Sequence, residues 1–160
     1  MFIALVIQGA TMIGYLDANG DPHLEIDVAN PLGWKSKLKC LIDTGFTGFL
    51  SVPILDAFPI GLLLVGTLPV TLADGRVQNK LMCLGNASVG AEAHVGVILI
   101  EPGSSQTLLG MEFFRVFKKR LIVDPIAGIV ELVDSAGTGP PTGSVPLSSL
   151  LPPTSPTSSK

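Results

Sequence analysis

A period of two runs through most of this chain, and turn-forming dipeptides interrupt it at short intervals. Leu24, Ile26 and Val28 alternate with Glu25 and Asp27, so one side of that segment is apolar and the other is charged. Such alternation is typical of a half-buried β-strand, because successive side chains of a strand point to opposite faces of the sheet. The pattern predicts that the larger part of the chain folds as β-sheet.

Similar segments recur along the chain. Three lysines alternate with other residues from Lys35 to Lys39, and the segment then becomes wholly apolar through Leu41 and Ile42. Further strands are predicted at Gly48–Val52, Leu68–Leu72, Arg76–Leu84, Ala93–Ile100, Leu121–Val123 and Ile129–Val133. The turn signals that separate strands are Asn19-Gly20, Asn30-Pro31, Asp74-Gly75, Gly85-Asn86, Pro102-Gly103 and Asp124-Pro125.

Two short segments have the character of helices. They are Ile54–Phe58 and Met111–Lys118, and the second contains no Gly or Pro and carries basic residues at its C-terminal end, which favours a helix. Many short strands with one or two short helices predict an all-β fold in which the sheet closes into a barrel or folds over itself.

The two ends of the chain differ from its middle. Ser135–Lys160 is rich in Pro, Ser, Thr and Gly, so it has too little apolar surface to offset the entropy of ordering. We therefore expect a disordered tail at 135–160 and a folded domain at 12–134. Residues 1–11 are either an N-terminal extension or the product of a misassigned start, with Met12 as the true first residue.

Composition excludes several classes of function. The apolar run at 1–10 is shorter than the roughly 20 residues that span a bilayer and lacks the basic start of a signal peptide, so we expect no membrane partner and a cytoplasmic location. With a net charge of −3, one basic cluster at Lys118–Arg120 offers no surface for nucleic acid. His23 and His94 stand apart from Cys40 and Cys83, so we expect no metal and no cofactor.

One segment carries chemistry. Asp43 directly follows an apolar strand, Thr44 and Gly45 come next, and a second apolar strand follows. Gly45 allows a sharp turn and lets its N–H approach the carboxylate. Two such carboxylates held close together cannot both ionise, so they share a proton. One can then act as general base on a water while the other donates to a carbonyl. Alone, Asp-Thr-Gly is also an ordinary turn.

Three motifs together resemble a known family. Ile42-Asp43-Thr44-Gly45-Phe46-Thr47-Gly48, Leu72-Ala73-Asp74-Gly75 and Leu108-Leu109-Gly110-Met111 are similar to motifs of the clan AA aspartic proteases, in particular the small prokaryotic, single-domain kind related to retroviral proteases. The resemblance covers about residues 12 to 133. One departure is Phe46, where retroviral and pepsin-like enzymes usually have Ala or Ser.

The resemblance implies a closed, retropepsin-like barrel and an aspartic endopeptidase that is active only as a homodimer, with Asp43 as the catalytic residue of each subunit. It implies that Thr44 and Gly45 form the active-site loop and that Leu108, Leu109 and Gly110 pack beneath that loop. Asp74 and Gly75 would lie in a flap over a peptide or protein substrate.

Two alternatives bear on this interpretation. Asp134-Ser135-Ala136-Gly137 could pass for a second catalytic motif, but a tail rather than a returning strand follows it. The chain is also too short for the two half-domains of a pepsin-like enzyme. The alternative function is a catalytically silent module of the same fold that binds peptides or supports assembly. An intact Asp-Thr-Gly argues against it, because a pure binder has no need of a like-charge pair.

Overall fold

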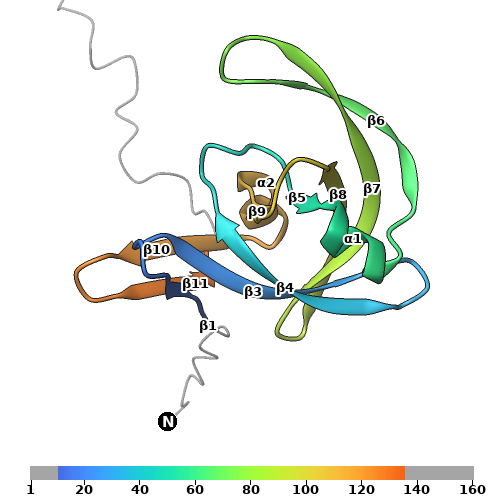
Figure 1. The fold of residues 1–160 in the computed structure, drawn as a ribbon. Helices are drawn as coiled ribbons and strands as arrows, with labels where there is room; N and C mark the ends of the chain where they lie inside the picture. The colour runs from blue at the N-terminus through green and yellow to red at the C-terminus, as the bar shows by residue number, and fades with distance from the viewer. Residues whose placement is uncertain (1–10, 136–160) are drawn as a thin grey trace, which may run out of the picture.

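The computed structural model of the protein describes residues 11–135, and strands make up most of this part of the chain (Figure 1). The elements are β1 (Met12–Ile13), β2 (Tyr15–Leu16), β3 (Pro22–Ala29), β4 (Lys35–Ile42), β5 (Leu50–Pro53), α1 (Ile54–Ile60), β6 (Leu64–Thr71), β7 (Val77–Val89), β8 (Glu92–Glu101), β9 (Thr107–Leu109), α2 (Met111–Val116), β10 (Lys119–Asp124) and β11 (Ile129–Asp134). The predicted extension, apart from residue 11, and the predicted tail beyond Ser135 lie outside the described residues.

Six strands close into a barrel. The hydrogen-bonded order is β3-β4-β9-β5-β8-β7, and β7 pairs back onto β3 through Asn86–Ser88 opposite Asp27–Ala29. Most pairs are antiparallel, but β9 runs parallel to β4, and β5 runs parallel to β8. The predicted all-β fold with a closed barrel and two short helices is therefore confirmed.

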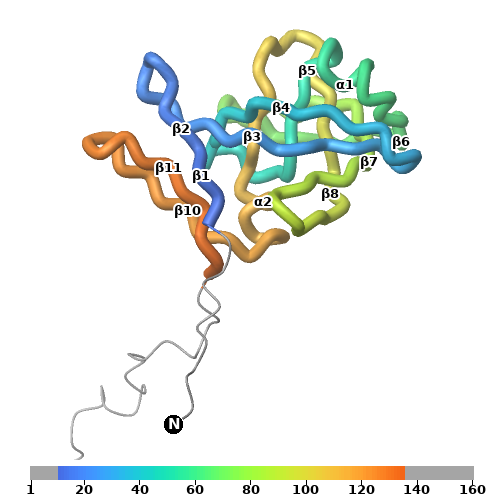
Figure 2. The backbone as a smooth tube through the Cα atoms, turned by 90° about the horizontal axis from the view of Figure 1, so that it is seen from below, coloured from blue at the N-terminus to red at the C-terminus, as the bar shows by residue number. Residues whose placement is uncertain are grey.

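A second sheet of three strands, in the order β1-β11-β10, stands to one side of the barrel (Figure 2). The β10–β11 hairpin projects beyond the barrel in both views. Apolar side chains of this sheet and its turn are exposed, among them Ile13, Ile122, Val123 and Ile126. Within residues 11–135, the outer edge of β10 pairs with no other strand.

The barrel interior is filled by side chains that the period-two pattern predicts to be buried. Leu24, Ile26 and Val28 of β3 are buried, and Glu25 is exposed. The phenylalanines of α2 and its end complete the core, with the rings of Phe113 and Phe117 stacked at 4.3 Å between centroids. Cys40 and Cys83 are buried free thiols and form no disulfide with each other.

Two sequence interpretations of local structure need correction. The predicted turn at Gly85-Asn86 is wrong, because β7 continues through both residues to Val89. Strand β8 pairs with this stretch on one side and β3 on the other. A side chain at Gly85 would lie within 3.0 Å of Ile98, so the glycine serves close packing there. The second helix ends at Val116 rather than Lys118, whose φ of 52° is left-handed.

Candidate active site

Asp43 lies where β4 leaves the barrel wall. Its backbone N–H donates to the carbonyl oxygen of Leu109 at 3.0 Å, and its own carbonyl oxygen accepts from the N–H of Phe46 at 3.1 Å. The N–H of Gly45 donates to Asp43 Oδ1 at 2.9 Å. Asp43 as a residue is half-buried, whereas Thr44 and Gly45 are exposed at the tip of the loop. The loop thus fixes one carboxylate oxygen and presents the residues beside it to the outside.

The segment Leu108–Gly110 lies directly against this loop. Leu109 is fully buried and pairs with Ile42 in the parallel β4–β9 ladder. Immediately after it, the N–H of Gly110 donates to the carbonyl oxygen of Phe49 at 3.1 Å. The N–H of Met111 donates to the carbonyl oxygen of Phe46 at 2.8 Å. Two stretches far apart in the sequence, both predicted as parts of one site, therefore meet in the structure.

Gly110 has no room for a side chain. A Cβ atom there would lie closer than 3.0 Å to the carbonyl oxygen of Gly48 and to the ring of Phe46. The same ring lies over Gly48, where an added Cβ would also be closer than 3.0 Å. The Phe46 side chain is therefore accommodated between two glycines.

Asp74 and Gly75 lie at the turn of the β6–β7 hairpin, which arches over the loop between β4 and β5 (Figure 1). The N–H of Leu72 donates to the carbonyl oxygen of Arg76 at 2.8 Å, and Gly75 has a left-handed φ of 82°. Hydrogen bonds from the backbone N–H and guanidinium of Arg76 hold the pKa of Asp74 below its usual range. The two predicted flap residues therefore lie at the tip of this hairpin, and their role as a flap stays a prediction.

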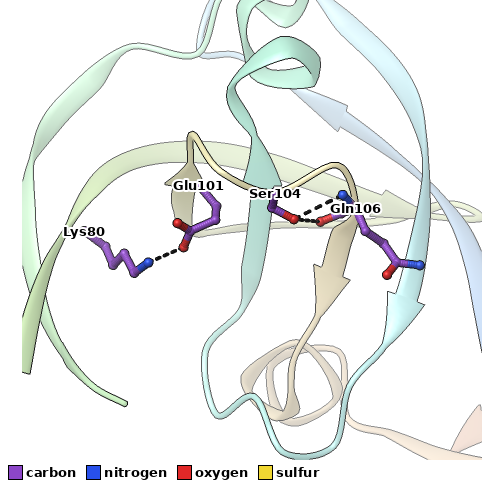
Figure 3. A network of polar contacts seen from close by, with 4 residues as sticks. All are labelled: Lys80, Glu101, Ser104 and Gln106. Atoms are coloured by element: carbon purple, nitrogen blue, oxygen red, sulfur yellow. Dashed lines mark hydrogen bonds and ion pairs between the residues drawn. The ribbon is translucent and has the colours of Figure 1, made fainter. Parts of the chain in front are cut away.

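The hairpin has a free outer part and an attached inner part. Strand β7 pairs with β8 from Val89 back to Leu81, and beyond Leu81 it pairs with β6 alone. Lys80 and Glu101 form an ion pair at this boundary (Figure 3). Only 13% of the lysine side chain and 30% of the glutamate side chain are exposed. The pair joins the hairpin to the end of β8 at the point where the outer part begins.

Sequence reasoning did not find this ion pair. Lys80 falls in the predicted strand Arg76–Leu84, and Glu101 directly precedes a turn signal. The sequence does show that Lys80 stands next to the apolar residues Leu81 and Met82, which is a sign of a partly buried charge. Nothing in the sequence indicates which carboxylate pairs with it. Figure 3 also shows Ser104 and Gln106, which exchange two hydrogen bonds of 3.0 and 3.1 Å in the turn that leads into β9.

A groove runs between the Asp43 loop and the hairpin. It consists of two cavities of about 380 Å³ each, which share Thr47, Gly48, Leu68 and Leu99 as walls. The first cavity is further lined by Gly45, Phe46 and the outer part of β6, Pro69–Thr71. The second is further lined by Phe49, Val95, Gly96, Val97, Glu112 and Val116. The first cavity therefore adjoins the Asp43 loop, and the second continues away from it.

Within residues 11–135, no group of three or more His, Cys, Asp or Glu side chains is arranged to hold a metal ion. No helix in the same range is long and apolar enough to cross a bilayer.

Comparison with known proteins gives a consistent result at the level of fold. No protein-family model and no curated protein matches the chain. Among solved structures, a retropepsin-like aspartic protease from Rickettsia conorii superposes with a TM-score of 0.58 at 16% identity, covering 85% of this chain and all of that one. EIAV protease, solved with an inhibitor, superposes with a TM-score of 0.53 at 11% identity, covering 67% of this chain and 97% of that one. The chain has the fold of the retropepsin-like aspartic proteases.

Proposed function

We propose that the protein is an aspartic endopeptidase in which Asp43 activates the water that attacks a peptide bond. The observation that carries this proposal is the position of Asp43, a half-buried residue whose carboxylate accepts from the N–H of Gly45 and whose backbone N–H donates to Leu109. A groove passes beside this loop, and a hairpin arches over it. A carboxylate on a rigid loop next to a covered groove is what general acid–base hydrolysis requires.

The proposed mechanism needs two carboxylates with different proton occupancy. One takes a proton from the water while the other donates a proton to the carbonyl oxygen. Asp43 is the one carboxylate on its loop, so the second is proposed to come from Asp43 of another copy of the chain. Thr44 and Gly45 would lie next to the twofold axis, and their exposure in the single chain is compatible with that position.

We propose that the three-stranded sheet contributes to the dimer. The outer edge of β10 is unpaired within residues 11–135, and free strand edges readily pair with another chain. Ile13, Ile122, Val123 and Ile126 expose apolar surface on this sheet and its turn. Burial of these side chains against a second copy would stabilise an assembly that brings two Asp43 loops together.

Asp134 is not proposed as a second catalytic group. It ends β11 and forms an ion pair with Lys119, which also pairs with Glu92 at 2.8 Å. Both contacts raise the pKa of Lys119 above its usual value. A carboxylate held by a lysine at the end of the three-stranded sheet has a structural role.

The decisive experiment compares the purified protein with its Asp43→Asn variant on a peptide library between about pH 3 and about pH 8, the range in which carboxylate pairs exchange protons. Cleavage by the wild-type protein alone supports the proposal. Cleavage that survives in the variant would falsify it. Peptide binding without cleavage by either protein would instead establish the catalytically silent module.

A further inference from the structure

We infer that the second cavity of the groove is a subsite for a lysine or arginine side chain of the substrate, recognised by Glu112. This inference rests on the proposed function, since it assigns a specificity to the groove beside Asp43. It concerns a substrate residue displaced from the scissile bond, because the cavity shares Thr47 and Gly48 with the first one but includes neither Gly45 nor Phe46.

The walls of this cavity are mostly apolar. Phe49, Leu68, Leu99 and Val116 come from four different elements or loops and surround it with aliphatic and aromatic surface. At about 380 Å³ the cavity has room for a long side chain. Apolar walls bind the methylene stem of lysine or arginine well, because these residues bury their stems and keep the charged head near water.

One charged side chain stands among the described residues that line the cavity, and it is acidic. Glu112 is in the first turn of α2, and its backbone N–H donates to the carbonyl oxygen of Gly48 at 3.1 Å, so its position relative to the groove is fixed. Its side chain is 38% exposed. A cationic head group in the cavity would therefore find an acidic residue in the lining, with part of its side chain in contact with water.

Glu112 already has a partner, Arg115, one turn along α2. The arginine side chain is 74% exposed, and Arg115 is not part of the cavity lining. Surface pairs at this spacing contribute little to stability, because both ions remain hydrated. Arg115 is therefore a competitor for the same carboxylate rather than an obstacle in the cavity, and its removal should strengthen the attraction for a substrate cation.

An uncharged apolar side chain is the alternative occupant of this cavity. It differs from a basic side chain in its interaction with Glu112. Leucine or norleucine would fill the walls but leave the Glu112 carboxylate facing an apolar group. Lysine or arginine fills the same walls and places a positive charge next to it. Charge complementarity therefore favours the basic side chain, and the preference should be lost when the Glu112 carboxylate is removed.

The test uses two readouts that do not depend on each other. The first is the cleavage of a peptide library, scanned at each position for arginine against norleucine. The second is the binding of fluorescently labelled peptides to the Asp43→Asn variant by anisotropy, which needs no turnover. We expect a preference for arginine or lysine of about fivefold at one position, in line with a partly hydrated ion pair.

Variants of the two helix residues distinguish recognition from structure. Glu112→Gln should abolish the preference, Glu112→Lys should reverse it towards acidic side chains, and Arg115→Gln should increase it. All three variants lose the ion pair between Glu112 and Arg115. If the pair had a purely structural role, all three would change the preference for basic side chains in the same direction. Circular dichroism and thermal unfolding would confirm that each variant is folded.

The outcomes separate this inference from the proposed function. Cleavage with no basic preference, or a preference that Glu112→Gln leaves intact, overturns the subsite and leaves the protease standing. Glu112-dependent binding of basic peptides without any cleavage overturns the protease and leaves the subsite standing. If Glu112→Gln and Arg115→Gln changed the preference for basic side chains in the same direction, the role of Glu112 would be structural and the subsite would be overturned.

Discussion

The backbone N–H of Asp43 donates a hydrogen bond of 3.0 Å to the carbonyl oxygen of Leu109. This bond continues the parallel ladder of β4 and β9 by one residue past the last pair, Ile42 with Leu109. The candidate carboxylate therefore follows the last regular residue of a barrel strand and inherits the rigidity of the barrel wall. A position this well fixed suits a group that must meet a partner and a bound water at hydrogen-bond distance.

Replacing Asp43 by Asn should reduce peptide cleavage by at least about 10³-fold, because the amide can neither take nor share the proton that general acid–base catalysis moves. The fold should survive, since Asn keeps the shape of the side chain and an oxygen for the N–H of Gly45. Activity on the best library peptide and the thermal unfolding curve measure the two effects. Asp27→Asn is the matched control, because Asp27 lies on β3 and faces Lys37 at 3.8 Å.

The proposed dimer makes mixing experiments informative. If each active site needs Asp43 from two chains, random exchange of equal amounts of wild-type protein and Asp43→Asn variant should leave about a quarter of the activity of an undiluted wild-type sample, because only one dimer in four keeps both carboxylates. A self-sufficient subunit would leave about half. Analytical ultracentrifugation of each protein before mixing shows whether the two chains form dimers at the concentration used.

Gly110→Ala should distort the Asp43 loop. The new methyl group would lie closer than 3.0 Å to the carbonyl oxygen of Gly48 and the ring of Phe46, and such overpacking typically costs about 1–3 kcal/mol. We expect a lower melting temperature together with a loss of activity. Gly103→Ala is the matched control, since nothing lies within 4 Å of a Cβ atom there. Equal melting temperatures and activities of the two variants would show that the Asp43 loop tolerates the displacement caused by a methyl group at residue 110.

Lys80→Met should loosen the outer part of the hairpin. It leaves Glu101 partly buried without its cation, and a two-stranded ribbon is only marginally stable by itself. Amide hydrogen exchange in residues 68–79 should accelerate at least about tenfold, whereas exchange in the β7–β8 ladder near Cys83 should change much less. The charge-reversed pair, Lys80→Glu with Glu101→Lys, should restore part of the protection. Uniform acceleration throughout the barrel would instead indicate a general loss of stability.

Stability should fall at alkaline pH because of a buried thiol. Burial raises the pKa of Cys40 from 9.0 to about 12, with a smaller contribution from Asp56. The thiol of the unfolded chain ionises near pH 9, whereas that of the folded chain stays neutral until about pH 12. The contribution of this group is complete below pH 9 and is lost between these two values, at up to about 1.4 kcal/mol per pH unit.

Urea unfolding of wild type and Cys40→Ala at several pH values checks this expectation. The quantity to compare is the slope of the free energy of unfolding against pH. The smaller side chain of the variant lowers the free energy of unfolding by the same amount at every pH, so it does not affect this slope. The slope should be shallower in the variant but not zero, because burial also raises the pKa of Cys83. Parallel slopes for the two proteins would show that Cys40 titrates in the folded state as it does in the unfolded chain.

The strands with strong alternation could be predicted from the sequence, because burial of one face of a sheet imposes a period of two. Leu24, Ile26 and Val28 are the clearest case, and all three are buried. Strand β9 could not be predicted as a strand, because three residues contain no measurable period. Leu108 and Leu109 were recognised instead through their resemblance to a family motif, which marked their relation to Asp43 but not the parallel pairing with β4.

The long-range geometry was beyond the sequence. Nothing in the segment around Gly85 indicates that β7 pairs with β3 there, and the local signal pointed to a turn. The same holds for Glu112, whose place in the groove depends on a hydrogen bond between α2 and Gly48. Local pattern determines which residues face inward, whereas the partners of each strand depend on contacts between distant segments, which a single sequence does not display.

The contact between Asp43 and Leu109 also has a consequence for protein synthesis. The ribosome produces the Asp-Thr-Gly loop well before the segment that holds it, so a nascent chain that ends before β9 lacks the hydrogen bond from Asp43 and the packing of Gly110. If the protein cleaves peptides, the capacity to do so requires β9 and the start of α2 to have been synthesised and packed against the loop.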